Sequence, residues 1–74
     1  MLTNKWTMQD RNNANYVFKQ KEDGLFYSTK IRGGIPGDCF GNEVELLRMM
    51  IDNNLENVLV IYKDDTYNWF AKKM

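Results

Sequence analysis

The chain contains no histidine and a single cysteine, Cys39. Histidine is the side chain whose ordinary pKa lies nearest to neutral pH, so it serves most often as general base, proton shuttle or metal ligand. Its absence excludes Ser–His–Asp and Cys–His catalytic sets and zinc sites that combine cysteine with histidine. One cysteine cannot form an internal disulfide, so the fold must depend on its apolar core. We therefore expect no catalytic residue, no cofactor and no metal site.

The sequence also has no excess of positive or negative charge and no long apolar run. Ten basic and ten acidic residues give a formal net charge of zero, so no long-range field attracts nucleic acid or an anionic membrane. No stretch approaches the ~20 apolar residues of a membrane span, and the first residues lack the apolar run of a signal peptide. Together with a free cysteine, these absences predict a cytoplasmic protein with no membrane partner, and they make nucleic acid an unlikely partner.

What is present indicates one folded unit. Hydrophobic residues make up 43% of the chain and aromatic residues 14%, which is typical of a globular protein and not of a disordered one. We expect a single small domain over residues 1–74. Nine asparagines, and seven lysines against three arginines, favour a phage, other viral or mobile-element source, which would place the protein in the host cytoplasm.

Hydrophobic alternation predicts several strands. Residues 5–9 alternate, with Trp6 and Met8 on one side, and predict a short strand followed by a turn over 10–13. Residues 15–20 and 25–31 alternate on either side of Asp23-Gly24, a strong signal for a β-hairpin.

The C-terminal third predicts two further strands. Residues 57–62 are almost continuously apolar and β-branched, as in a strand buried on both faces. Residues 66–70 alternate again and predict a closing strand. A helix beginning at Asp65 is the alternative, because Tyr67, Phe70 and Ala71 also share a helical spacing.

One helix is predicted over residues 43–53. Asn42 is a favourable N-cap, Glu45 three residues later can complete a capping box, and Asn53 or Asn54 can end the helix in the left-handed region. Residues 32–38 contain three glycines and a proline and predict a loop. The predicted fold is α+β, in the order β-β-β-α-β-β. One helix packs on one face of a four- to five-stranded, largely antiparallel sheet.

The predicted helix is apolar around most of its circumference. We expect Val44, Leu47 and Ile51 to face the sheet, which leaves a second apolar arc facing outward. Residues on the opposite face of the sheet are also apolar: Val17, Phe26, Leu59, Ile61 and Phe70. Such surplus apolar surface is typical of a partner interface. The alternative is that the N-terminal segment folds across the second face and closes it.

The favoured function is a small non-catalytic protein-binding module, an inhibitor or modulator of a host or cellular protein, with a homodimer also possible. The residues predicted to contact the partner combine the outer helix arc, the second sheet face and the glycine-rich loop: Phe26, Gly34, Ile35, Leu46, Met49, Met50, Trp69 and Phe70.

Other candidate sites have simpler structural interpretations. Cys39 has no histidine to activate it and lies beside Phe40, which favours a packed thiol. The glycine-rich loop lacks the spacing of known phosphate-binding loops, and Asp64-Asp65 is typical of a turn. Nucleic-acid binding is an alternative function, supported by basic residues interleaved with aromatic ones: Lys19, Lys21, Lys30, Arg32, Lys72 and Lys73, with Phe18, Tyr27 and Trp69.

A third function follows from a resemblance. The order of the predicted elements, the segment from Asn42 to Leu46 and the segment from Ile61 to Asp65 resemble parts of the ribonuclease H-like family. The resemblance implies a magnesium-dependent nuclease in which Asp10, Glu45 and Asp64 would converge on the metal. The family's glycine-rich segment after the first aspartate is absent from this chain.

Overall fold

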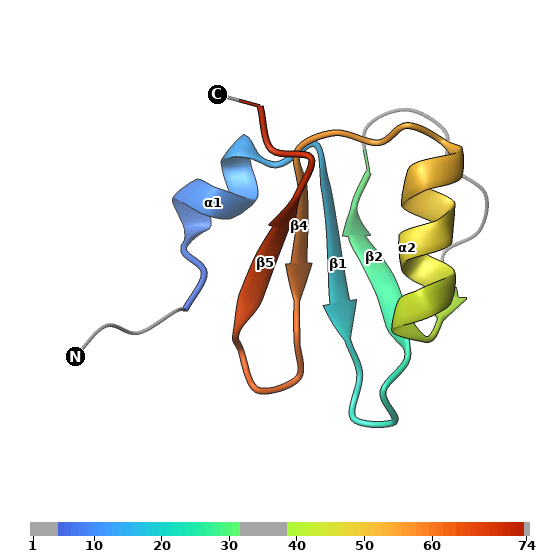
Figure 1. Ribbon diagram of the computed structural model, residues 1–74. Coiled ribbons are helices and arrows are strands. Elements are labelled where there is room, and N and C mark those ends of the chain that lie inside the picture. Colours follow the sequence, from blue (N-terminus) through green and yellow to red (C-terminus); the bar gives the residue numbers. More distant parts are fainter. Residues whose placement is uncertain (1–4, 32–38, 74) are drawn as a thin grey trace.

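The computed structural model describes residues 5–31 and 39–73 and shows an α+β fold (Figure 1). Along the chain its elements are α1 (Met8–Asn13), β1 (Tyr16–Gln20), β2 (Phe26–Lys30), β3 (Cys39–Gly41), α2 (Glu43–Asp52), β4 (Val58–Ile61) and β5 (Tyr67–Phe70). The predicted α+β class is confirmed, but the order begins with a helix and gains the short strand β3. No helix within the described residues has the length and apolar character needed to cross a membrane.

The sheet has five strands in the order β3-β2-β1-β4-β5. Its central pair, β1 and β4, is parallel, and the three other neighbouring pairs are antiparallel. The prediction of a largely antiparallel sheet is therefore correct except at its centre. A parallel pair needs a long crossover, and here the chain from β2 through β3 and α2 provides it.

The local signals for the hairpins and for α2 are confirmed. Gly24 has φ +90° in the turn between β1 and β2, a conformation that glycine adopts without steric cost. Asn42 caps α2 by accepting a hydrogen bond from the Glu45 N–H at 2.9 Å, and the Glu45 carboxylate accepts one from the Asn42 N–H at 3.0 Å. Asn54 takes the left-handed conformation, φ +53°, just beyond the helix. The closing segment is strand β5, so the alternative of a C-terminal helix is wrong.

The face of α2 that packs on the sheet is the reverse of the one predicted. Leu46 and Met50 are fully buried, whereas Val44 and Ile51 are exposed. Leu46 and Met50 join a core cluster formed with residues of β1, β2 and β4 and with the segment after α2: Phe18, Phe26, Leu55, Val58 and Val60. Burial of each large side chain is worth about 1.5–3 kcal/mol, so this layer supplies much of the stability of the domain.

The second face of the sheet is covered by the N-terminal segment. Trp6 and Ala14, on either side of α1, pack against a cluster of Val17, Leu59 and Ile61. Lys5 forms a β-bridge with Thr66, and Arg11 donates a hydrogen bond to the Thr29 carbonyl at 3.1 Å. The segment therefore runs across the sheet, from the start of β5 to the end of β2, on the face opposite α2; Figure 1 shows the two helices on different sides of the strands. The alternative in which this segment closes the second face is the one observed.

The predicted strand over residues 5–9 is wrong because a capping box begins a helix there. The Thr7 hydroxyl accepts a hydrogen bond from the Asp10 N–H at 3.1 Å, and the Asp10 carboxylate accepts one from the Thr7 N–H at 2.9 Å. These two bonds satisfy backbone groups that a helix N-terminus would otherwise leave unpaired. The predicted turn over residues 10–13 is thus the body of α1.

The strand predicted from residues 57–62 is buried on both faces, as expected. Val58 and Val60 belong to the cluster beneath α2, while Leu59 and Ile61 belong to the cluster beneath the N-terminal segment. The second-face prediction is correct for Val17, Leu59 and Ile61. It is wrong for Phe26 and Phe70, which lie on the α2 side of the sheet.

Candidate functional site

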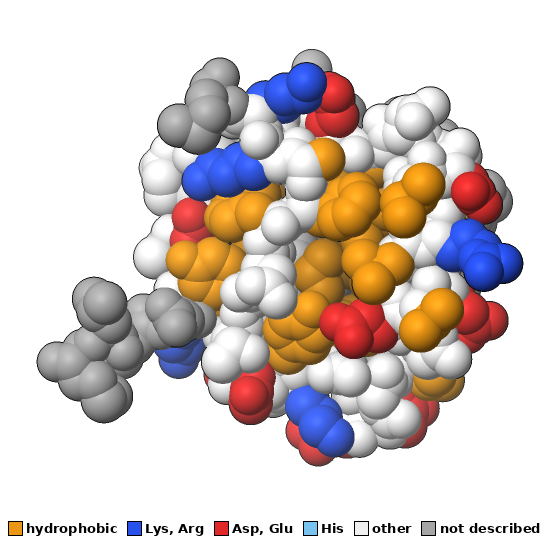
Figure 2. All heavy atoms as spheres, in the orientation of Figure 1, with side chains coloured by type: hydrophobic (Ala, Val, Ile, Leu, Met, Phe, Trp, Pro, Cys, Tyr) orange, Lys and Arg blue, Asp and Glu red, His pale blue; other side chains and the backbone are white. Residues whose placement is uncertain are grey.

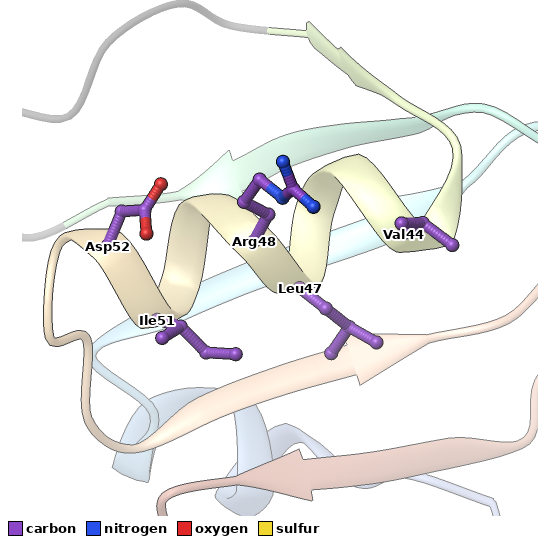
Figure 3. A pocket seen from close by; sticks show the side chains of 5 residues that line it. All are labelled: Val44, Leu47, Arg48, Ile51 and Asp52. Atoms are coloured by element: carbon purple, nitrogen blue, oxygen red, sulfur yellow. The ribbon is translucent and has the colours of Figure 1, made fainter.

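The exposed side of α2 carries three aliphatic side chains at positions i, i+3 and i+7. Val44 is 67% exposed, Leu47 38% and Ile51 61%. We call Val44, Leu47 and Ile51 the α2 strip. The strip lines a shallow depression of ≈ 350 Å³, and Arg48 and Asp52 border it (Figure 3). Large aliphatic side chains are normally buried, so three on one helix face form a distinctive surface.

A groove adjoins the α2 strip, because α2 leaves part of its side of the sheet uncovered. The groove has a volume of ≈ 300 Å³ and lies between α2 and strands β4 and β5. Its apolar lining comes from both layers: Leu47, Met50, Val60, Tyr62, Trp69 and Phe70. We call it the α2–β5 groove. Figure 2 shows hydrophobic side chains gathered on this face, over α2 and the neighbouring strands, with charged side chains mainly around them.

A polar contact links helix and sheet along the groove. The Tyr62 hydroxyl donates a hydrogen bond to the Glu43 carboxylate at 2.8 Å and accepts one from the Asn68 amide at 3.3 Å. Burial is the main cause that raises the pKa of Tyr62 above its usual value of 10.0; the Asn68 bond lowers the pKa, and Glu43 raises it. Tyr62 is therefore neutral at physiological pH and holds the start of α2 against β4.

The acidic residues of the ribonuclease H-like alternative do not converge. Asp10 caps α1 on one side of the sheet, and Glu45 caps α2 on the other. Asp64 accepts a hydrogen bond from the Thr66 hydroxyl at 2.6 Å, in the turn before β5. Among the residues that the structure describes, no group of three or more Asp, Glu or Cys side chains could hold a metal ion. These three carboxylates therefore do not form the shared magnesium site that the resemblance implies.

Several lysines of the nucleic-acid alternative have partners within the chain. Lys30 donates hydrogen bonds to the carbonyls of Arg11 and Asn12 at the end of α1. Lys72 lies over the Trp69 ring, 4.7 Å from its centroid, and Lys73 pairs with Glu56 at 3.1 Å. These lysines therefore contact other residues of the chain, and they lie at separate places on the fold.

The structure places the predicted contact residues in different environments. Phe26, Leu46 and Met50 are fully buried, which corrects their expected position on an open surface. Met49 and Phe70 are half-buried against the cluster beneath α2, and Trp69 is half-buried on the opposite side of the sheet. Phe70 and Trp69 are both among the residues that line the α2–β5 groove. Gly34 and Ile35 lie outside the described residues.

The α2 strip was assigned to the core from the sequence and is instead the exposed surface. A signal for the correct orientation lies in the charged residues of the helix. At about 100° per residue, Arg48 and Asp52 lie about 120–160° away from Met50 and Leu46 on the helical wheel. The residues opposite the charges are the ones that the structure buries.

Comparisons with known proteins leave this site to be interpreted from its own geometry. The chain matches no protein-family model, and no curated protein or solved structure is significantly similar to it.

Proposed function

We propose that this chain is a small protein-binding module that acts without catalysis, through the α2 strip and the α2–β5 groove. The observation that carries the proposal is the exposure of Val44 and Ile51, more than 60% each, beside a groove that is itself lined mainly by apolar side chains. When a partner covers such a surface, apolar area is removed from water, and each Å² of it contributes about 25 cal/mol of favourable free energy.

The form of the surface supports a protein partner. The α2 strip presents its side chains at the spacing with which an amphipathic helix enters a hydrophobic groove. Half-buried aromatic residues, Tyr62 and Phe70, line the neighbouring groove, and aromatic side chains are enriched at the centres of interfaces. A module of this kind inhibits or modulates another protein by occupying its surface, and a host protein is the target that the composition favours.

The proposal is tested by placing a charge on the strip. Ile51→Asp should fold normally, because Ile51 is 61% exposed, and should lose its protein partner. Met8→Asp is the matched control, because Met8 is 62% exposed but belongs to α1, on the other side of the sheet. Each tagged variant is used to capture partners from a lysate of the source cell, and far-UV circular dichroism confirms the fold. Capture of the same proteins by Ile51→Asp and wild type would show that the strip is not the binding surface.

A further inference from the structure

We infer that the α2 strip seats a second copy of this chain, with the two α2 helices antiparallel about a two-fold axis. The inference rests on the proposed function, because it names the partner of the same surface. It depends on three features of α2 and its surroundings: the charges beside the strip, the spacing of the strip, and a depression at the end of the helix.

The charges beside the strip are self-complementary. Arg48 and Asp52 lie one helical turn apart on the same flank of α2 (Figure 3). Within the described part of the chain, neither takes part in an ion pair. A two-fold axis that is perpendicular to two facing antiparallel helices brings the same flank of each together. If the axis passes midway between Arg48 and Asp52, each Arg48 lies opposite the partner's Asp52, and two interchain ion pairs form.

With the same axis, the apolar side chains of the two α2 helices interdigitate. The rise of about 1.5 Å per residue places Leu47 about 4.5 Å from the axis level on one side and Ile51 about 1.5 Å from it on the other. In the pair, the four side chains then follow each other along the seam at intervals of about 3 Å. The order is Leu47, the partner's Ile51, Ile51 and the partner's Leu47, so no two side chains occupy one level.

Val44, the remaining residue of the α2 strip, also lies against the partner copy. In this register Val44 lies at the level of the partner's segment just after α2, from Asn54 to Glu56. A shallow apolar depression lies at that end of the helix, lined in part by Ile51, Leu55 and Phe70. The register that pairs the charges therefore also places Val44 beside apolar side chains. With a formal net charge of zero, two copies meet without long-range repulsion.

Charge reversal tests this register. In Arg48→Glu both facing pairs become acidic, and in Asp52→Lys both become basic, so each variant alone should dimerise at least about tenfold more weakly than wild type. An equimolar mixture of the two restores opposite charges in both pairs and should dimerise like wild type. Sedimentation equilibrium of the purified proteins measures each dissociation constant, and circular dichroism confirms that these exposed substitutions leave the fold intact.

The outcomes separate this inference from the proposed function. A wild-type chain that stays monomeric at every concentration overturns the second copy as partner, while loss of capture by Ile51→Asp still supports the binding of another protein. A dimer whose dissociation constant is unchanged in both charge variants also overturns the inference. Weak dimers in the single variants and recovery in the mixture support it.

Discussion

Replacing Leu46 and Leu47 with alanine, one at a time, measures which face of α2 packs on the sheet. The two leucines are adjacent in one helix, so the gain in helix propensity is the same for both and cancels in the comparison. Leu46 has no exposed surface and contacts the core beneath α2, whereas Leu47 is 38% exposed. Leu46→Ala removes buried carbons and leaves a cavity, so it should lower the free energy of unfolding by about 3 kcal/mol. Leu47→Ala should lower it by about 1 kcal/mol.

Urea unfolding followed by far-UV circular dichroism gives both free energies, at a protein concentration low enough to keep the chain monomeric. In a domain of this size each kcal/mol corresponds to about 4–8 °C in Tm, so the melting temperatures should differ by about 8–16 °C. After the entropy cost of folding, the net stability of a domain this small is only about 3–5 kcal/mol, so Leu46→Ala should lie close to its folding limit. An equal or larger loss in Leu47→Ala would refute the packing of Leu46 against the sheet.

Two further predictions concern local contacts. Gly41 has φ +79°, and its Cβ position is occupied by the carboxylate of Glu45, which would have to move and give up its capping bond to the Asn42 N–H; Gly24 has φ +90°, and a Cβ there would meet only the Gln20 amide at van der Waals distance. Gly41→Ala should therefore destabilise the fold more than Gly24→Ala, which costs only about 1–2 kcal/mol of backbone strain, and equal losses in urea unfolding would contradict the clash. The hydrogen bond from the Thr66 hydroxyl, and to a smaller extent that from the Thr66 N–H, holds the pKa of Asp64 below its usual 3.8. The stability that these bonds to the ionised carboxylate contribute is therefore present above pH 3.8 and is lost as the pH falls through the folded-state pKa. Thr66→Val should raise the pKa of Asp64 toward 3.8 in an NMR titration, and an unchanged pKa would show that the hydroxyl is not the cause.

Elements encoded by short-range signals could be predicted from the sequence. The Asp23-Gly24 turn, the Asn42–Glu45 capping box and the apolar run at 58–61 each depend on residues within a few positions of one another, and the structure shows all three. Thr7 and Asp10 form the same kind of capping box, but the alternation of Trp6 and Met8 favoured a strand. The extended entry to a helix and the first residues of a strand look alike over so short a stretch.

The orientation of α2 was not predictable from its apolar residues alone. Val44, Leu47 and Ile51 form a helical stripe as regular as that of Leu46, Met49 and Met50, so periodicity offers two faces to the sheet. What distinguishes them is the position of Arg48 and Asp52, and the fit of Leu46 and Met50 among Phe18 and Phe26. The second factor is a long-range contact that no local pattern contains. The contact surface predicted from the sequence used the face of α2 that the structure buries. Its helical part is therefore the α2 strip and not Leu46 and Met50.

The sequence predicts more apolar surface than one helix on one sheet can bury. In the structure, this surplus has a different explanation on the second face of the sheet and on α2. On the second face of the sheet it is internal, because Trp6 and Ala14 cover Val17, Leu59 and Ile61. On α2 it is external, because no described segment covers Val44 or Ile51. The first surplus stabilises the fold and needs no partner. Binding is thus to be sought on one side of the domain, where a helix that already satisfies the core keeps a second apolar face in solvent.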